Sequence, residues 1–224
     1  MADTTIAYYE AQWKDLVKRY ESADVSGLQS LLASSFPSGS RLLELGCGSG
    51  RDAAFMVSRG FDVTASDAVQ EMIDAAADCH KALSGRFCRI CLPGDLTSSL
   101  GPFDGVYSVA TLMHLTRPAI HEVFSRLSLV IVPGGRLFFS VPLQRDDVRE
   151  DSFDAGGRWF TSLSRSAWAD ICRHAGFEII KTTTSSDGLG RESFAWFNCL
   201  AVCKNMAEET RTSETRAQSG EEFR

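Results

Sequence analysis

Three glycines at alternating positions, Gly46, Gly48 and Gly50, are the residues of this chain that most directly suggest chemistry. They follow the apolar run of residues 42–45, which is typical of a buried strand. Glycine lets the backbone approach a ligand closely and adopts positive φ angles that side chains disfavour. A dinucleotide-binding loop needs the spacing G-x-G-x-x-G, and Arg51 stands where its third glycine would be. The spacing therefore indicates a ligand other than a dinucleotide.

Two acidic residues flank this loop at the ends of predicted strands. Asp67 lies about 20 residues beyond the glycine turn, where a nucleotide-binding βαβ unit places the acid that binds ribose hydroxyls. Glu44 lies just before the loop, where its charge would repel a pyrophosphate but suits a ligand with an ammonium and a sulfonium group. We therefore expect the ligand to be S-adenosylmethionine.

Residues 42–50, LLELGCGSG, resemble the first motif of class I S-adenosylmethionine-dependent methyltransferases, apolar-apolar-acid-apolar-G-x-G-x-G. The turn GCGSGRDA, the aspartate-ended second strand and the turn Pro133-Gly134-Gly135 are similar to those of small bacterial members. The resemblance runs from about Tyr8 to Lys204. It implies an α/β, Rossmann-like fold with a seven-stranded, mostly parallel sheet, one antiparallel strand, and helices on both faces.

The same resemblance implies how the cofactor is held. The glycine loop would lie against the methionine part, Glu44 would orient its ammonium, and Asp67 would bind the ribose hydroxyls. Adenine would pack between apolar side chains and reach an acid and a backbone amide after strand three. The expected cofactor-binding residues are Tyr9, Glu44, Gly46, Cys47, Gly48, Gly50, Asp67, Ala68, Met72 (equally suited to the core), Asp95, Leu96 and Val109.

Each of the three acids also has an ordinary structural interpretation. Glu44 is able to form a salt bridge with Arg51 or Arg41 instead of meeting a ligand. Asp67 is able to cap the helix that follows it. Asp95 is equally an ordinary turn aspartate.

His114 follows strand four, where the resemblance implies substrate-facing groups near the transferred methyl. We expect it to take the acceptor's proton or to position the acceptor, the alternative being a histidine bonded only to backbone. Tyr8, Met113 and Arg158 are the expected acceptor contacts. Arg158 lies among aromatic residues and suits an anionic group, the alternative being a solvated charge. The aromatic stripe that includes Tyr8 and Tyr9 is equally consistent with core packing.

These residues predict methyl transfer from S-adenosylmethionine to a small polar or anionic molecule by in-line displacement. An RNA or protein methyltransferase and a non-catalytic S-adenosylmethionine-binding protein remain open as alternatives. A nicotinamide-dependent reductase is disfavoured, because the third glycine and a Tyr-x-x-x-Lys pair are both missing.

Composition restricts the partners and the compartment. The 224 residues are 44% hydrophobic, which suits one domain with a substantial core. The net charge of −6 opposes a broad phosphate-binding surface, so nucleic acid is a poor expected partner. Seven scattered cysteines, with no secretory or membrane-spanning segment, favour a reduced protein in the cytoplasm. Cys88 and Cys91 lack a second ligand pair, so we expect no metal.

Strands and helices alternate along most of the chain, which predicts a parallel sheet covered on both faces. We expect one domain over residues 1–205, including a helical cap in residues 1–36, and a disordered polar tail over residues 206–224. The expected helices are 6–20, 26–34, 51–59, 70–83, 118–131 and 165–175, and the expected strands are 41–45, 61–66, 86–92, 105–110, 136–141, 177–183 and 193–203.

Overall fold

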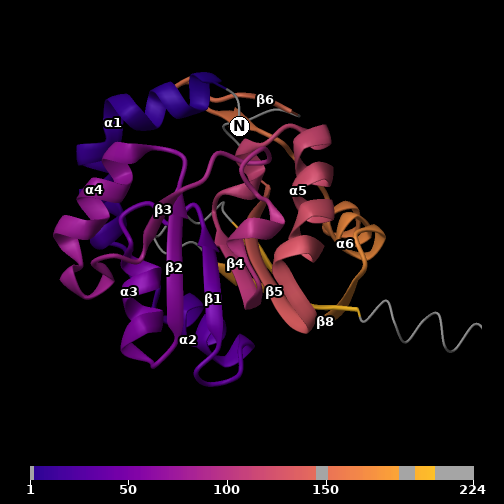
Figure 1. Ribbon diagram of the computed structural model, residues 1–224. Helices are drawn as coiled ribbons and strands as arrows, with labels where there is room; N and C mark the ends of the chain where they lie inside the picture. Colours follow the sequence, from indigo (N-terminus) through magenta and orange to yellow (C-terminus); the bar gives the residue numbers. More distant parts are fainter. Residues whose placement is uncertain (1–2, 145–150, 187–194, 205–224) are drawn as a thin grey trace, which may run out of the picture.

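The computed structural model describes residues 3–144, 151–186 and 195–204, so the tail expected from residue 206 lies outside the described residues. Its main sheet has seven strands in the order β3-β2-β1-β4-β5-β9-β8 (Figure 1). Strand β9 pairs antiparallel with both β5 and β8, and the other described pairs of this sheet are parallel. The expected fold, with one antiparallel strand in a seven-stranded sheet, is confirmed.

The bounds of the elements follow the predicted pattern closely. The strands are β1 (Arg41–Leu45), β2 (Asp62–Asp67), β3 (Phe87–Arg89), β4 (Phe103–Val109), β5 (Ile131–Gln144), β8 (Phe177–Ser186) and β9 (Ala195–Cys203). The α-helices are α1 (Asp3–Glu21), α2 (Ser26–Ser35), α3 (Arg51–Ser58), α4 (Gln70–Cys79), α5 (Arg117–Val130) and α6 (Arg165–His174). Short 3-10 turns are η1 (Lys81–Leu83), η2 (Ser98–Leu100) and η3 (Leu112–His114).

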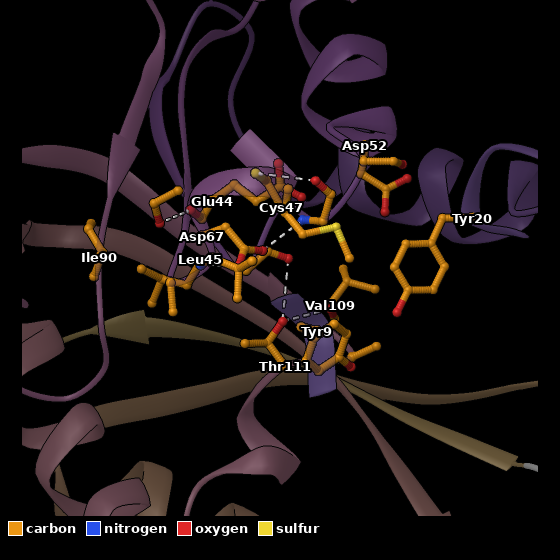
Figure 2. Close-up of a pocket in the computed structure, with 18 of the residues that line it drawn as sticks. Tyr9, Tyr20, Glu44, Leu45, Cys47, Asp52, Asp67, Ile90, Val109 and Thr111 are labelled. Carbon is orange, nitrogen blue, oxygen red and sulfur yellow. Dashed lines mark hydrogen bonds between the residues drawn. The ribbon is translucent and has the colours of Figure 1, made fainter. Parts of the chain in front are cut away.

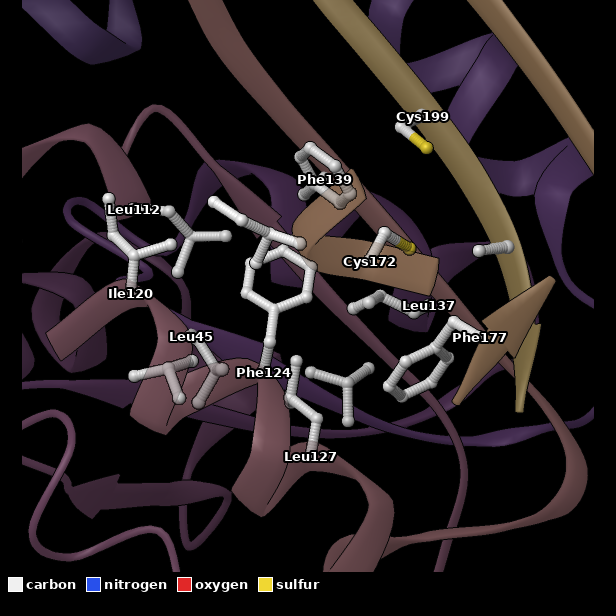
Figure 3. Close-up of a cluster of buried hydrophobic side chains, with 14 of the residues drawn as sticks. Leu45, Leu112, Ile120, Phe124, Leu127, Leu137, Phe139, Cys172, Phe177 and Cys199 are labelled. Atoms are coloured by element: carbon white, nitrogen blue, oxygen red, sulfur yellow. The ribbon is translucent and has the colours of Figure 1, made fainter. Parts of the chain in front are cut away.

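Successive side chains of β1 point to opposite faces of the sheet. Leu43 and Leu45 pack in a large core with side chains of α5 and α6, including Phe124 and Trp168. Figure 3 shows Leu45 in this core together with Phe124 and Leu127 of α5. Leu42 packs on the opposite face, with side chains of α2 and α3. Burial on both faces explains why this strand reads as an apolar run, and it makes Glu44 an isolated charge within that run.

Helix α1 covers α4 rather than the sheet. Its residues Leu16 and Val17 pack with Val69 and Met72, and aromatic side chains of α1 join this cluster. In Figure 1, α1 and β6 lie together at the top of the molecule, while α5 and α6 lie on the right. The N-terminal helix therefore reaches the same end of the molecule as the segment after β5.

Three local features differ from the expectation. The helix predicted over residues 70–83 ends at Cys79 and is followed by η1. The turn at Gly134, with φ of +78°, falls within β5, where the pairing with β4 shifts between Phe103 and Gly105. Strands β6 (Ser152–Phe153) and β7 (Trp159–Phe160) form a hairpin that is not among the expected strands.

Each strand of this hairpin is only two residues long, which is too short to give an alternating strand pattern. The hairpin is instead stabilised by the Asp154 carboxylate, which accepts hydrogen bonds from the backbone amides of Gly156 and Arg158 at 3.0 and 2.9 Å.

Among the described residues, no helix is long and apolar enough to cross a bilayer.

Candidate cofactor and acceptor site

A pocket opens at the carboxyl ends of β1, β2 and β4, with α1 as one wall (Figure 2). Strand β1 pairs with β2 on one side and with β4 on the other, so the strand order reverses at this point. Ligands of open α/β sheets bind at such a reversal, because the loops diverge there and leave a crevice. Position alone makes this pocket the candidate site.

Glycine is needed at the first position of the loop for steric reasons. Gly46 has φ of +79°, and a Cβ built there would lie 2.1 Å from the Thr111 hydroxyl oxygen. The amides of Gly46 and Cys47 both donate to the Ser66 carbonyl, at 2.8 and 2.7 Å. These contacts hold the turn after β1 between the ends of β2 and β4.

Asp67 lies at the end of β2 and reaches back to the loop. Its Oδ2 accepts the amide of Gly48 and its Oδ1 accepts the amide of Val69, both at 3.0 Å. Burial raises its pKa, and these backbone hydrogen bonds act in the opposite direction. The bond to Val69 is a local turn contact before α4, whose N-terminus has no side-chain cap, so the helix cap that we considered does not form. Each oxygen retains a second lone pair, so the carboxylate is still able to accept from a ligand.

Glu44 is the least compensated charge of the pocket. The residue is only 2% exposed, and its Oε2 has no hydrogen-bond partner. Burial raises its pKa well above the ordinary value, and the nearby Asp52 raises it further. The salt bridges that we considered do not form: Arg51 pairs with Asp52 at 3.1 Å, and the Arg41 guanidinium donates to the Pro102 carbonyl. Glu44 therefore lines the pocket as a buried carboxyl without a salt bridge to the described residues, and the buried Tyr107 hydroxyl beside it lowers its pKa only in part.

Most of the expected cofactor residues line this one pocket. They are Tyr9, Glu44, Gly46, Cys47, Gly48, Asp67, Ala68, Met72 and Val109. Three are placed elsewhere: Gly50 faces Ala76 and Leu83, Leu96 is fully buried, and Asp95 accepts the Cys91 amide at 2.8 Å in an exposed turn. The Asp95 contact is that of an ordinary turn aspartate.

Other lining residues were not expected. They are Tyr20, Leu45, Ser49, Arg51, Asp52, Ser66, Val69, Ile90, Leu92, Ala110 and Thr111. Tyr20 lies on the same helical face as Tyr9 and Trp13, so the periodicity of α1 contained a signal for it. Ala110 has φ of +56°, a strained angle at the end of β4 that the sequence does not reveal.

His114 lines the pocket and makes two hydrogen bonds through its ring. Its Nδ1 lies 2.8 Å from the Trp159 carbonyl oxygen, and its Nε2 lies 3.0 Å from the Tyr9 hydroxyl. A carbonyl oxygen only accepts, so Nδ1 carries the proton in the neutral ring, and Nε2 accepts from Tyr9. The backbone bond that we considered is present, together with a tyrosine that sequence alone did not pair with this histidine.

Arg158 lies in the hairpin next to α1 rather than in solvent. Its Nε and Nη2 both donate to the Asp154 carboxylate, and its guanidinium stacks 4.9 Å from the Tyr8 ring centroid and 5.2 Å from that of Phe160. Burial alone would lower the pKa of Arg158, but Tyr9 and Asp154 raise it overall. Tyr8, Met113 and Arg158 do not line the pocket themselves; they lie in the elements packed around His114.

Backbone contacts fasten this hairpin over the end of β4. The Trp159 amide donates to the Thr5 hydroxyl at 2.8 Å, and the Thr161 amide donates to the Met113 carbonyl at 2.8 Å. Helix α1, η3 and the hairpin therefore form one cover over the pocket. Within the described residues no group of three or more His, Cys, Asp or Glu side chains is arranged to hold a metal ion.

Comparison with known proteins agrees with this geometry. Among the curated relatives, the chain is 34% identical over 113 residues to a protein-L-isoaspartate O-methyltransferase of Chlorobium phaeobacteroides. It is 36% identical over 106 residues to a ubiquinone biosynthesis O-methyltransferase of Xylella fastidiosa. The matches cover 49% and 46% of this chain, and 51% and 42% of those proteins. The chain thus spans about half the length of the curated relatives that it matches.

A solved structure shares the whole fold. The 1,6-didemethyltoxoflavin-N1-methyltransferase of Burkholderia thailandensis, with its substrate and S-adenosylhomocysteine bound, superposes with a TM-score of 0.75. The superposition covers 91% of this chain and 89% of that one at 19% identity, so it supports the fold. A family profile described as a methyltransferase domain matches residues 8–182. The chain therefore belongs to the methyltransferase-domain family, among the class I S-adenosylmethionine-dependent methyltransferases.

Proposed function

We propose that the chain binds S-adenosylmethionine in this pocket and transfers its methyl group to a small molecule. The observation that carries the proposal is the buried Glu44 carboxyl, which lines the pocket while the nearby Arg51 pairs with Asp52 instead, beside a loop whose first glycine leaves no room for a side chain. A buried acceptor without a donor is costly, and an ammonium group supplies both a donor and the opposite charge. The residues present therefore fit this cofactor.

The lining residues divide the pocket between cofactor and acceptor. Glu44 would hold the ammonium and Asp67 the ribose hydroxyls, while Ala68 and Met72 would pack on adenine. When bound, the cofactor supplies a methyl group on a sulfonium, which is an excellent leaving group. In Figure 2, Tyr9, Val109 and Thr111 lie on the opposite side of the pocket from Glu44 and Asp67. This second side is where we propose that the acceptor binds.

The protein's own contribution is alignment and exclusion of water. The cover of α1, η3 and the hairpin shields the end of β4, and His114 lies beneath it at 2% exposure. Holding an acceptor in line with the methyl converts a bimolecular step into an effectively unimolecular one. Net charge of −6 favours a small molecule over RNA as the acceptor.

The acceptor class is also part of the proposal. The curated relatives named above are O-methyltransferases, which favours an oxygen acceptor. Asp154 neutralises much of the charge of Arg158, so a polar acceptor is favoured over an anionic one.

The free state of all seven cysteines supports our proposal of a reducing compartment such as the cytoplasm.

Two measurements test the function. Isothermal titration should show binding of S-adenosylhomocysteine to the wild type, and a Glu44→Gln variant should bind it more weakly. A panel of small phenols, catechols, amines and thiols should include an acceptor that releases S-adenosylhomocysteine from S-adenosylmethionine. Binding of NADH without S-adenosylhomocysteine would overturn the cofactor assignment. Turnover of RNA or protein alone would overturn the acceptor assignment.

A further inference from the structure

We propose that Tyr9 is the residue that takes the acceptor's proton, and that it passes its own proton to His114. This inference rests on the proposed function and adds a catalytic residue to it. From the sequence we expected His114 to take the acceptor's proton or to position the acceptor, and Tyr9 to contact the cofactor. The geometry assigns the two residues consecutive places in one proton path, here called the Tyr9–His114 relay.

The hydrogen bonds of His114 exclude a direct role in the observed arrangement. The Trp159 carbonyl fixes the proton on Nδ1, and the lone pair of Nε2 is already directed at the Tyr9 hydroxyl. A neutral imidazole has no third nitrogen with which to meet an acceptor. Any proton that reaches His114 without rearrangement must therefore come through the Tyr9 oxygen.

Tyr9 is also the residue with access to the pocket. Both Tyr9 and His114 line it, together with Val109, Ala110 and Thr111 at the end of β4. Burial raises the pKa of Tyr9 well above its ordinary value, and the neighbouring Tyr20 raises it further. Its hydroxyl therefore stays protonated, so it is able to accept a proton only as it gives one away. This property suits a relay rather than a permanent phenolate base.

Within the described residues, the titratable groups that act on the Tyr9 hydroxyl come from two elements. Tyr20 of α1 and Arg158 of the hairpin both affect the Tyr9 hydroxyl, and Arg158 lowers its pKa. The pairing of Arg158 with Asp154 offsets the charge that would otherwise oppose a protonated His114. The imidazolium formed at the end of the step is thus placed near a neutralised, not a free, cation.

The relay balances the reaction for an acceptor that carries an O–H or N–H group. The acceptor atom forms a bond to the methyl carbon while the carbon–sulfur bond breaks and its electron pair stays on sulfur. The acceptor's proton moves to the Tyr9 oxygen, and the Tyr9 proton moves to Nε2 of His114. The positive charge that began on sulfur ends on the imidazolium, which returns its proton to solvent after product release.

Two variants separate this relay from a simple clamp between α1 and η3. Tyr9→Phe removes both the clamp and the relay. His114→Gln keeps an amide oxygen able to accept from Tyr9, but an amide is not basic, so only the relay is lost. On an acceptor that must lose a proton, such as catechol, both variants should reduce kcat by about a hundredfold or more. 4-Nitrothiophenol is already a thiolate at neutral pH and needs no proton transfer, so the loss of kcat in His114→Gln should be at least about tenfold smaller on this acceptor than on catechol.

Several outcomes would overturn the relay. Unchanged kcat of His114→Gln on catechol would show that Tyr9 and His114 only clamp the cover. Equal losses on catechol and on the thiolate would show a positioning effect. Turnover of the thiolate but of no O–H or N–H acceptor by the wild type would remove the need for a relay, while leaving methyl transfer intact. Failure of S-adenosylhomocysteine to bind would instead contradict the proposed function.

A second measurement needs no acceptor. Nitrogen-15 NMR of histidine-labelled protein with S-adenosylhomocysteine should show His114 as the neutral tautomer with its proton on Nδ1. A proton on Nε2 in the neutral ring would overturn the relay, because that nitrogen could not then accept from Tyr9. The Tyr9→Phe variant should retain this tautomer, since the Trp159 carbonyl defines it.

Discussion

The carboxylate of Asp67 accepts the backbone amide of Gly48 at 3.0 Å, so the acid that ends β2 also holds the glycine loop that follows β1. The two residues lie 19 positions apart, Asp67 at the end of β2 and Gly48 in the loop after the neighbouring parallel strand β1. One carboxylate thus has two tasks in our proposal: it shapes the loop for the methionine part of the cofactor and binds the ribose. This relationship gives the first prediction.

Asp67→Ala should weaken S-adenosylhomocysteine binding by about tenfold to a hundredfold, because hydrogen bonds to a charged acceptor contribute about 1.5–3 kcal/mol. Isothermal titration measures this loss. Asp62→Ala is the matched control, since Asp62 begins the same strand and pairs with exposed Arg86 away from the pocket. Equal affinities of the Asp67→Ala and wild-type proteins would contradict the ribose assignment.

Glu44 should make the free protein less stable as pH rises. Burial raises its folded pKa above the ordinary value of 4.5, so the folded state keeps a proton that the unfolded state loses. The free energy of unfolding should therefore fall as pH rises from about 4.5 through the folded pKa. Urea unfolding at several pH values should show a flatter profile for Glu44→Gln. Parallel profiles for the two proteins would contradict an ionisable, uncompensated Glu44.

Cofactor binding should displace the proton from Glu44. The groups that face this carboxyl are Asp52 and Arg51 of α3, Asp67 of β2, Tyr107 of β4 and Cys47 of the loop. Arg51 is already paired with Asp52, so the incoming ammonium is the cation that Glu44 lacks. Titration of S-adenosylhomocysteine in buffers with different ionisation enthalpies should show proton release below the folded pKa. Release of the same size from Glu44→Gln would assign the proton to another group.

Gly50→Ala should destabilise the fold more than Gly60→Ala does. Both glycines have positive φ, +78° and +87°, so each substitution costs about 1–2 kcal/mol from the backbone alone. A Cβ at Gly50 would also lie 2.9 Å from the Ala76 Cβ, whereas nothing lies within 4 Å at Gly60. Overpacking should add about 1–3 kcal/mol at Gly50. Equal urea-unfolding energies for the two variants would contradict this close contact.

Arg158 and Asp154 should be energetically coupled. The arginine side chain is 16% exposed and the aspartate 6%, and two guanidinium nitrogens donate to one carboxylate. Burial would raise the pKa of Asp154, but its hydrogen bonds from Arg158 lower it overall from 3.8. Its contribution to stability is therefore present above pH 3.8 and lost as pH falls through the lower folded value.

A double-mutant cycle with Arg158→Lys and Asp154→Asn measures this coupling. We expect about 1.5–3 kcal/mol, because a planar fork that donates twice to a carboxylate is replaced by a single ammonium. Additive losses would show that the pair contributes little. Arg158→Lys should also raise the acceptor's KM while leaving S-adenosylhomocysteine affinity unchanged, if the hairpin shapes the acceptor side.

The sequence by itself predicted the architecture and most of the residues on the proposed cofactor side of the pocket. A buried parallel strand requires an apolar run, so Glu44 stood out as a charge within one, and the glycine spacing marked the turn after it. These signals are local, because each motif lies at the end of a single strand, and the strand order brings those ends together. The confirmed sheet, with β9 antiparallel, follows from the same alternation and the family resemblance.

Tertiary structure alone decided the acceptor half. Tyr9 and His114 are 105 positions apart, and the Trp159 carbonyl that fixes the histidine tautomer lies 45 positions beyond His114. Helix α1, η3 and the β6–β7 hairpin are far apart in the sequence and meet only in the folded structure, so no sequence motif predicts their contact. Because of the same packing, Gly50 and Leu96 lie outside the pocket and Arg158 donates to Asp154. Long-range packing, which single-strand patterns do not encode, therefore determines which side chains face the acceptor.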